Sequence, residues 1–126
     1  MKEIKQLTRS ELQVMLVLWN LPKQHGYTGD ILAQYADPKP AYTTLATFLK
    51  ILTQKGFVKY RKIGNKLFYT PLVSQTEYAE CFLAPTKENF FGGSFYEMMR
   101  FFLRHENLST GEINDLVQLI HETQGK

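Results

Sequence analysis

The sequence predicts a mainly α-helical protein that contains one small β-hairpin. Three hydroxyl residues are each followed, three positions later, by a glutamate and then by an apolar-rich stretch. This capping-box pattern marks a helix start, because the two side chains satisfy backbone N–H groups that the helix leaves open. Two short β-prone runs flank Gly64-Asn65, which suits a two-residue turn. The three boxes are Thr8–Glu11, Ser74–Glu77 and Ser109–Glu112.

Composition is that of a small globular protein. The 126 residues, 44% hydrophobic and 21% charged, are enough for one compact domain or for two small lobes. The longest apolar run near the N-terminus, residues 14–19, is far shorter than the roughly 20 residues that a membrane span needs. The single cysteine, Cys81, leaves no internal disulfide and suits a reducing compartment. We therefore expect a soluble, cytoplasmic protein without membrane insertion.

Charge is distributed unevenly along the chain. Residues 1–73 hold 11 Lys/Arg and 4 Asp/Glu, whereas residues 74–126 hold 4 and 8. No acidic residue occurs between Asp37 and Glu77, a stretch that contains seven basic ones. Such a run is often only a solvated surface, but the asymmetry between the halves also favours a polyanion as the partner of the first half. The second half then has a different role.

Two helices are expected in the first forty residues. The first starts at the Thr8 box and ends near Asn20, before a proline, and the second runs from an N-cap at Thr28 to Tyr35. In the first helix a buried stripe is expected at Leu12, Met15, Leu16 and Trp19, with Trp19 in the core. In the second helix the inward residues are expected to be Ile31, Leu32 and Tyr35.

A third helix, from about Tyr42 to Gln54 or Lys55, separates apolar from polar side chains. At 100° per residue, four apolar residues fall on one side: Leu45, Phe48, Leu49 and Leu52. On the other side lies what we call the polar ridge, spaced i, i+4, i+7, i+11: Thr43, Thr47, Lys50 and Gln54. Gly56 is placed to end the helix in the left-handed conformation.

The β-prone runs at residues 57–61 and 67–71 complete an order of helix, short helix, helix and hairpin, which is that of a winged helix-turn-helix. A helix that reads the major groove needs donors, acceptors and methyl groups on its exposed side, and threonine offers a hydroxyl and a methyl. The polar ridge residues Thr43, Thr47, Lys50 and Gln54 are therefore the predicted base-reading set. The predicted contacts to the DNA backbone are Thr44, Lys39, Lys62, Asn65 and Lys66.

After Val73 the chain is predicted to be helical again. Helices are expected from Ser74 to about Leu83, from Ser94 to His105 and from Ser109 to about Glu122, and the first is followed by APTKEN at 84–89 and the loop FFGGS at 90–94. So much apolar surface cannot be buried inside a lobe this small, which indicates a dimerisation surface. The alternative is that the lobe packs only onto the first half. The predicted dimerisation residues are Phe95, Met98, Met99, Phe102, Ile113, Leu116, Val117 and Ile120.

Signatures of catalysis and metal binding are missing from the sequence. His25, His105 and His121 are far apart, and none stands at metal-ligand spacing from a cysteine or an acid. No phosphate-binding loop, dinucleotide fingerprint or H-E-x-x-H motif is present. We therefore expect no enzymatic activity, no metal and no cofactor.

Five motifs extend over nearly the whole chain: LTRSELQVMLVLW at 7–19, TTLATFLKILTQKGFV at 43–58, GNKLFYTPLVSQTEY at 64–78, FFGGSFYEMMRFF at 90–102 and LSTGEINDLVQLI at 108–120. In order and spacing they resemble those of the penicillinase-repressor (BlaI/MecI-type) family of bacterial winged-helix regulators. The resemblance implies an N-terminal DNA-binding domain, a C-terminal helical dimerisation domain and repression by a dimer on a two-fold-related operator. It also implies induction through proteolytic cleavage, prompted by a membrane-bound sensor-protease.

Four features depart from the pattern of that family. The cleaved Asn-Phe bond of the family falls on Phe101-Phe102, the implied cleavage position, where the asparagine is absent. The arginine common in the middle of the recognition helix is Ile51, and the usual Gly-Arg of the wing is Gly64-Asn65. Both changes favour a different operator or a weaker hold on the backbone. Copper-responsive relatives carry paired C-x-C cysteines, whereas Cys81 stands alone, so copper sensing is not expected.

The expected organisation is a DNA-binding domain over residues 1–73 and a dimerisation domain over residues 74–126. The expected function is repression by a homodimer bound to a pseudopalindromic operator in double-stranded DNA. Two alternatives stay open. One is a winged-helix module that binds another protein, and the other is a regulator that senses a small ligand directly and is not induced by proteolysis.

Overall fold

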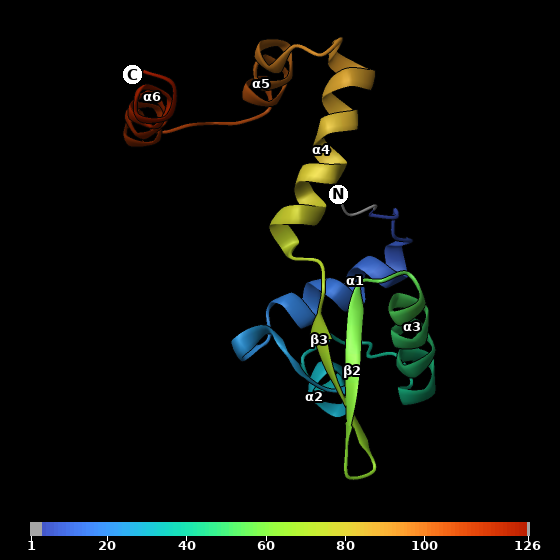
Figure 1. Ribbon diagram of the computed structural model, residues 1–126. Coiled ribbons are helices and arrows are strands. Elements are labelled where there is room, and N and C mark those ends of the chain that lie inside the picture. Colours follow the sequence, from blue (N-terminus) through green and yellow to red (C-terminus); the bar gives the residue numbers. More distant parts are fainter. Residues whose placement is uncertain (1–3, 126) are drawn as a thin grey trace. The chain divides into compact units, whose positions relative to one another are not determined.

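The computed structural model describes residues 4–125, and the chain divides into two compact units, Met1–Ala84 and Pro85–Lys126 (Figure 1). We call them the N-terminal unit and the C-terminal unit. The helix α4, Gln75–Phe91, contributes to both. The sequence predicts a different boundary, after Val73, between a DNA-binding domain and a dimerisation domain. This boundary stays a prediction.

Three helices and a three-stranded antiparallel sheet build most of the N-terminal unit. In chain order the elements are α1 (Arg9–Trp19), the 3-10 turn η1 (Pro22–Gln24), β1 (Gly26–Tyr27), α2 (Thr28–Ala33), α3 (Tyr42–Gln54), β2 (Val58–Ile63) and β3 (Lys66–Pro71). The strand order is β1-β3-β2. The sequence did not predict β1, because two residues are too few to show any alternation.

The starts of α1 and α2 are stabilised by side-chain hydrogen bonds. At α1 the predicted box is confirmed: the Thr8 N–H donates to Glu11 Oε1 at 3.1 Å, and the Glu11 N–H donates to Thr8 Oγ1 at 3.3 Å. The predicted N-cap of α2 was one residue too late. Tyr27 occupies that position, and its N–H donates to Asp30 Oδ2 at 2.9 Å, while Thr28 is buried.

The core of the N-terminal unit lies where α1 and α3 meet the sheet. Trp19 belongs to it as predicted, and its indole N–H donates to the Val73 carbonyl at 2.9 Å. The predicted stripe on α1 was only partly right, because Leu12 and Leu16 are half-buried. The fully buried residues of α1 are Val14, Met15 and Leu18. On α3 the predicted face is confirmed, with Leu45, Leu49 and Leu52 each 0% exposed and Phe48 packed against them.

The hairpin of β2 and β3 turns at Gly64-Asn65, as predicted. Ile63 pairs with Lys66 next to the turn, and Tyr60 pairs with Tyr69 further along the ladder. Gly64 has a φ of +66° and Gly56, which follows α3, has a φ of +82°. Glycine adopts this conformation without the steric cost that other residues meet. The two strands are longer at the turn end than the sequence indicated.

Helix α4 continues past its predicted end near Leu83 and into the loop predicted at residues 90–94. The Ser74 box is present, since the Ser74 N–H donates to Glu77 Oε1 at 2.8 Å and the Glu77 N–H donates to Ser74 Oγ at 3.0 Å. The helix then continues through Pro85 to Phe91. Proline removes one helical hydrogen bond and does not forbid the helix when the flanking residues favour it. The chain turns only at Gly92-Gly93, where both φ angles are positive.

The C-terminal unit contains α5 (Phe95–Arg104) and α6 (Thr110–Gln124), close to the predicted bounds. Ser94 and Ser109 are their N-caps, and each accepts a hydrogen bond from the N–H of the glutamate three residues on. Among the described residues of this unit, Met98 is the one that is buried. No helix in the described part of the chain is both long and apolar enough to span a membrane.

Candidate nucleic-acid interface

The polar ridge of α3 is exposed along its whole length. Thr43, Thr47, Lys50 and Gln54 all face solvent, while the leucines behind them fill the core. The Thr47 hydroxyl donates to the Thr43 carbonyl at 3.0 Å. Its hydrogen is therefore engaged, and what it presents outward is a methyl group and the oxygen lone pairs.

The beginning of α3 is open to an anion. Its N-cap is Ala41, which has no side-chain acceptor for the first N–H groups of the helix, and Thr44 lies exposed in the first turn. These N–H groups carry the positive end of the helix dipole. Lys39, just upstream, donates to the carbonyls of Ala33 and Tyr35 at 3.1 and 2.6 Å, so it also caps the end of α2.

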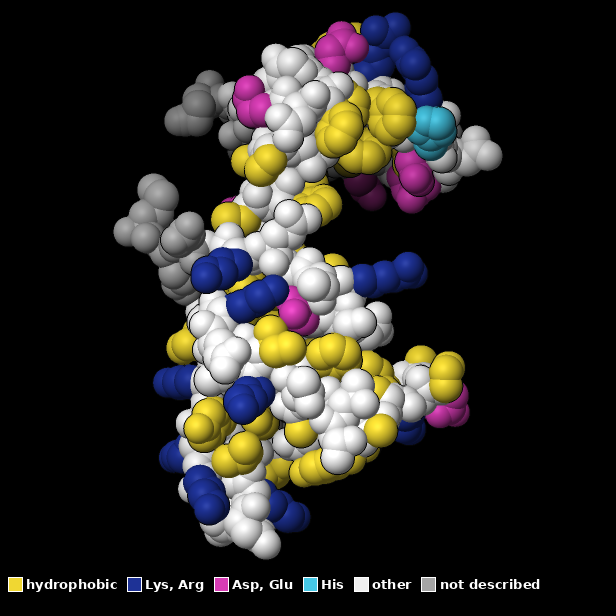
Figure 2. Space-filling view, turned by 90° about the vertical axis from the view of Figure 1, so that its right-hand side faces the viewer, with side chains coloured by type: hydrophobic (Ala, Val, Ile, Leu, Met, Phe, Trp, Pro, Cys, Tyr) yellow, Lys and Arg dark blue, Asp and Glu magenta, His cyan; other side chains and the backbone are white. Residues whose placement is uncertain are grey.

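The hairpin carries further basic side chains. Lys62, Asn65 and Lys66 are exposed, as a contact to a DNA backbone requires. Lys66 Nζ also lies 5.8 Å from the centroid of the Tyr27 ring, and the guanidinium of Arg61 lies 5.9 Å from that of Phe68. Figure 2 shows Lys and Arg side chains spread over the N-terminal unit with few acidic ones among them. Sequence reasoning left Arg61 out of the predicted set.

A groove of about 560 Å³ separates α3 from the hairpin. On the helix side its wall includes Tyr42 and Lys50, and on the hairpin side Tyr60, Asn65, Lys66 and Tyr69. Tyr42 and Tyr60 are absent from the predicted set, because their rings resemble core residues in the sequence. Tyr42 precedes Ala46 by four positions and Lys50 by eight, so the three lie in one row along the helix. This row meets the polar ridge at Lys50.

The end of α3 is tied to the start of α1 by an ion pair. Lys55 Nζ lies 2.6 Å from Glu11 Oε1, and the Glu11 side chain is only 7% exposed. Burial alone would raise the pKa of Glu11, but the hydrogen bonds and the charge of Lys55, together with Thr8, hold it below its ordinary value. The Glu11 carboxylate is therefore ionised near pH 7, and its contact with Lys55 links the end of α3 to the start of α1.

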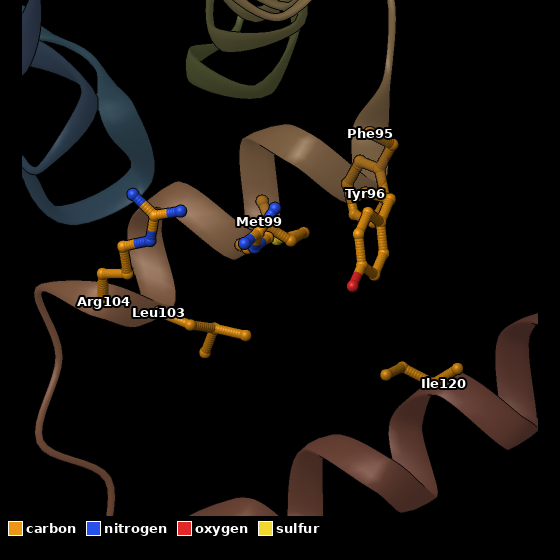
Figure 3. Close-up of a pocket in the computed structure, with 7 residues that line it drawn as sticks. Phe95, Tyr96, Met99, Leu103, Arg104 and Ile120 are labelled. Carbon is orange, nitrogen blue, oxygen red and sulfur yellow. The ribbon is translucent and has the colours of Figure 1, made fainter.

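In the C-terminal unit α5 and α6 leave a gap of about 600 Å³ (Figure 3). It is lined mainly by apolar side chains: Phe95, Tyr96, Met99, Leu103 and Ile120. Of the predicted dimerisation residues, Met98 is 7% exposed and Met99 is half-buried. The other six are exposed: Phe95, Phe102, Ile113, Leu116, Val117 and Ile120.

Comparison with known protein families shows to which family the chain belongs. The sequence profile of the penicillinase repressor family matches residues 7–122. The chain belongs to the penicillinase repressor family. It is 29% identical over 127 residues to the penicillinase repressor of Bacillus licheniformis, an alignment that covers 100% of this chain and 98% of the relative.

A solved relative confirms the fold that the sequence predicts for the N-terminal unit. The structure is similar to the solution structure of the DNA binding domain of the repressor BlaI, with a TM-score of 0.52 and 29% identity. The match covers 62% of this chain and 94% of that one. The fold is therefore a winged helix followed by further helices, and α3 is the helix that carries the polar ridge.

The residues that resemblance to the penicillinase repressor family marks for cleavage lie inside a helix. Phe101 and Phe102 are in α5, 45% and 44% exposed. The Phe101 ring contacts Phe91 and His105, with centroid distances of 5.6 and 4.9 Å. Within the described residues, no three His, Cys, Asp or Glu side chains are grouped closely enough to hold a metal ion.

Proposed function

We propose that this chain is a DNA-binding transcriptional repressor that acts as a homodimer on a pseudopalindromic operator. Membership of the penicillinase repressor family and the likeness to a DNA binding domain support the first part. The observation that carries it is the polar ridge, which faces solvent across α3 while three leucines anchor the opposite side at 0% exposure. A helix held in this way can lie in a major groove without rearrangement.

In this proposal the two sets of polar residues have different tasks. Thr43, Thr47, Lys50 and Gln54 meet base edges, where Thr47 offers a methyl to a thymine or lone pairs to an amino group. Thr44 and the open N–H groups of α3 meet a phosphate, and Lys39, Lys62, Asn65 and Lys66 meet the backbone on either side. The first set supplies sequence choice, and the second supplies affinity and register.

The dimer is supported by the C-terminal unit. Six predicted dimerisation residues are exposed, and the gap between α5 and α6 is unfilled. Apolar surface of this extent on a small helical unit is stabilised when a second copy covers it. A two-fold dimer of winged helices then predicts two half-sites about one helical turn apart, ~10 bp centre to centre, or a multiple of that. Functional domains at 1–73 and 74–126 are part of the same proposal.

The proposal also includes a mechanism of induction, in which proteolytic cleavage of the repressor ends repression. A membrane sensor-protease would prompt cleavage at Phe101-Phe102, and the loss of α6 would remove half of the dimerisation residues. Co-production with such a sensor from the same genome tests this: the expected result is a fragment that ends at Phe101 and no longer represses. An intact chain together with restored transcription would point to a ligand or another trigger instead.

The proposed function is tested in two steps. First, the full-length protein is used to select an operator from a pool of random duplexes. Its binding to the selected site and to random DNA is then measured from 50 to 200 mM salt. We expect a two-fold-related consensus and a loss of about 10³-fold or more over that range, as expected when on the order of six or more phosphates are neutralised. The absence of any enriched sequence would contradict the proposal.

A further inference from the structure

Three tyrosine side chains from three different elements converge in the groove between α3 and the hairpin. Tyr42 lies on α3, Tyr60 on β2 and Tyr69 on β3. Tyr60 and Tyr69 are cross-strand partners whose ring centroids lie 5.9 Å apart. Burial raises the pKa of Tyr69, and the neighbouring phenols of Tyr60 and Tyr42 raise it further.

Two of these phenols are available to a ligand. Tyr42 is 57% exposed and Tyr60 is 53% exposed, whereas Tyr69 is 4% exposed and forms the floor. No acidic side chain lines the groove, and Lys50 and Lys66 stand among its walls. The site therefore offers neutral O–H donors beside positive charge and ring faces, which suits an extended chain of phosphate groups joined by apolar sugar rings.

The position of the groove determines which part of a duplex it can meet. Its helix wall includes Lys50 and Gln54, the two ridge residues that open into the groove, with Tyr42 and Ala46 beside them, and its other wall is the hairpin. When the polar ridge lies in the major groove, the groove beside it meets the edge of that major groove, and the strand along this edge can run between α3 and the hairpin. Lys50 and Gln54 then reach from the groove toward base edges, while the hydroxyls of Tyr42 and Tyr60 beside them face the sugar–phosphate backbone.

We propose that the groove between α3 and the hairpin holds one strand of the DNA backbone, with the hydroxyls of Tyr42 and Tyr60 as hydrogen-bond donors to its phosphates. This inference rests on the proposed function and adds two positioning residues to it. They fix where α3 lies along the duplex, and they do so without charge. A neutral donor displaces no counterion, so its contribution to affinity is the same at low and at high salt.

The test uses Tyr42→Phe, Tyr60→Phe and the double variant in the full-length protein, which keep the rings and remove only the hydroxyls. Labelled duplexes of the selected operator and of random sequence are titrated at several salt concentrations. Each single variant should bind both duplexes about 3- to 10-fold more weakly, the effect of one neutral hydrogen bond, with an unchanged slope of log affinity against log salt. Tyr27→Phe, whose ring packs on Phe68 outside the groove, is the matched control and should bind as wild type.

Three results would overturn the inference: wild-type affinity in the double variant, a loss confined to the operator, or an equal loss in the Tyr27→Phe control. The second would make the tyrosines base-reading residues, and the third would remove the groove from the explanation. Failure of the proposed function is recognised separately, because in that case the wild-type protein shows no preference for any selected duplex.

Discussion

The two units of this chain place their apolar side chains in opposite ways. In the N-terminal unit the apolar residues of α1 and α3 are almost fully enclosed, down to 0% exposure for six leucine, valine and methionine positions such as Val14 and Leu49. In the C-terminal unit the stripe of α6 stays at 40–57% exposure. The helices themselves do not explain the difference in exposure, because both units have capped helices with apolar stripes. The N-terminal unit has a sheet for its helices to cover, and the C-terminal unit has none.

This difference separates what each unit can do alone. A closed core fixes the backbone, so the exposed side of α3 can be held in one geometry for recognition. An open apolar stripe gains free energy only when something covers it, and its stability then depends on concentration. The N-terminal unit therefore suits DNA recognition, and the C-terminal unit suits association with a second copy.

The largest expected difference between the two units is in the response to a leucine-to-alanine substitution, made once in each unit. Leu49→Ala leaves a cavity in the closed core and should lower the free energy of unfolding by about 2–5 kcal/mol at any protein concentration. Leu116→Ala, at 40% exposure on α6, should cost the isolated chain much less and should weaken dimerisation instead. Denaturant unfolding and sedimentation over a range of protein concentrations measure the two effects. A concentration-independent loss of the same size at both positions would erase the difference between the units.

A smaller difference is expected for the capping-box glutamates, because each unit has a helix that starts with such a box. Glu11 is enclosed and paired with Lys55, so Glu11→Gln should cost about 1–2 kcal/mol near pH 7. Because the folded-state pKa of Glu11 is below its ordinary value of 4.5, the unfolded chain takes up the proton first as pH falls. The stabilisation is therefore complete above about pH 5.5 and is lost on acidification through and below pH 4.5.

The matched control is Glu112→Gln, at the same box position of α6. Hydrogen bonds from the backbone and side chain of Ser109 also lower the pKa of Glu112, but this carboxylate is fully open to solvent. Thermal unfolding between pH 3 and pH 7 should show a weaker acid dependence for Glu11→Gln than for wild type, and little change for Glu112→Gln. A reversed order would mean that the ion pair with Lys55 does not stabilise the fold.

The smallest effect concerns the hairpin. Lys62→Ala removes one exposed charge, so binding to operator and to random DNA should weaken by the same modest factor, and the salt slope should become shallower by about one. Electrophoretic shifts at three or more salt concentrations measure this. Loss of operator binding alone would assign Lys62 to base readout.

The fold could largely be predicted from local signals in the sequence. The capping boxes, the leucines of α3 and the Gly64-Asn65 turn each act over four to eleven residues, and the structure confirms all of them. One error lay in the length of a helix: it was expected to end near Leu83, but it continues through Pro85 to Phe91. Strand β1 exists only because β3 is there to pair with it.

The candidate interface could be predicted where it follows one helix, and not where it joins several elements. The polar ridge is visible as a spacing in the sequence, and its exposure agrees with that spacing. Tyr42 and Tyr60 are 18 positions apart and come together only through the packing of α3 beside β2. Tyrosine is intermediate in its tendency to be buried, so the sequence around these two residues does not show that they are exposed.

The polar ridge is tested most directly by Thr43→Ala combined with Thr47→Ala, assayed for the ratio of operator affinity to random-duplex affinity at one fixed salt concentration. Each threonine that meets a base should contribute about 1–3 kcal/mol of discrimination, so the ratio should fall by about 30-fold or more while random-duplex affinity stays near wild type. An unchanged ratio, in a protein that still unfolds at the wild-type temperature, would show that α3 does not read the operator.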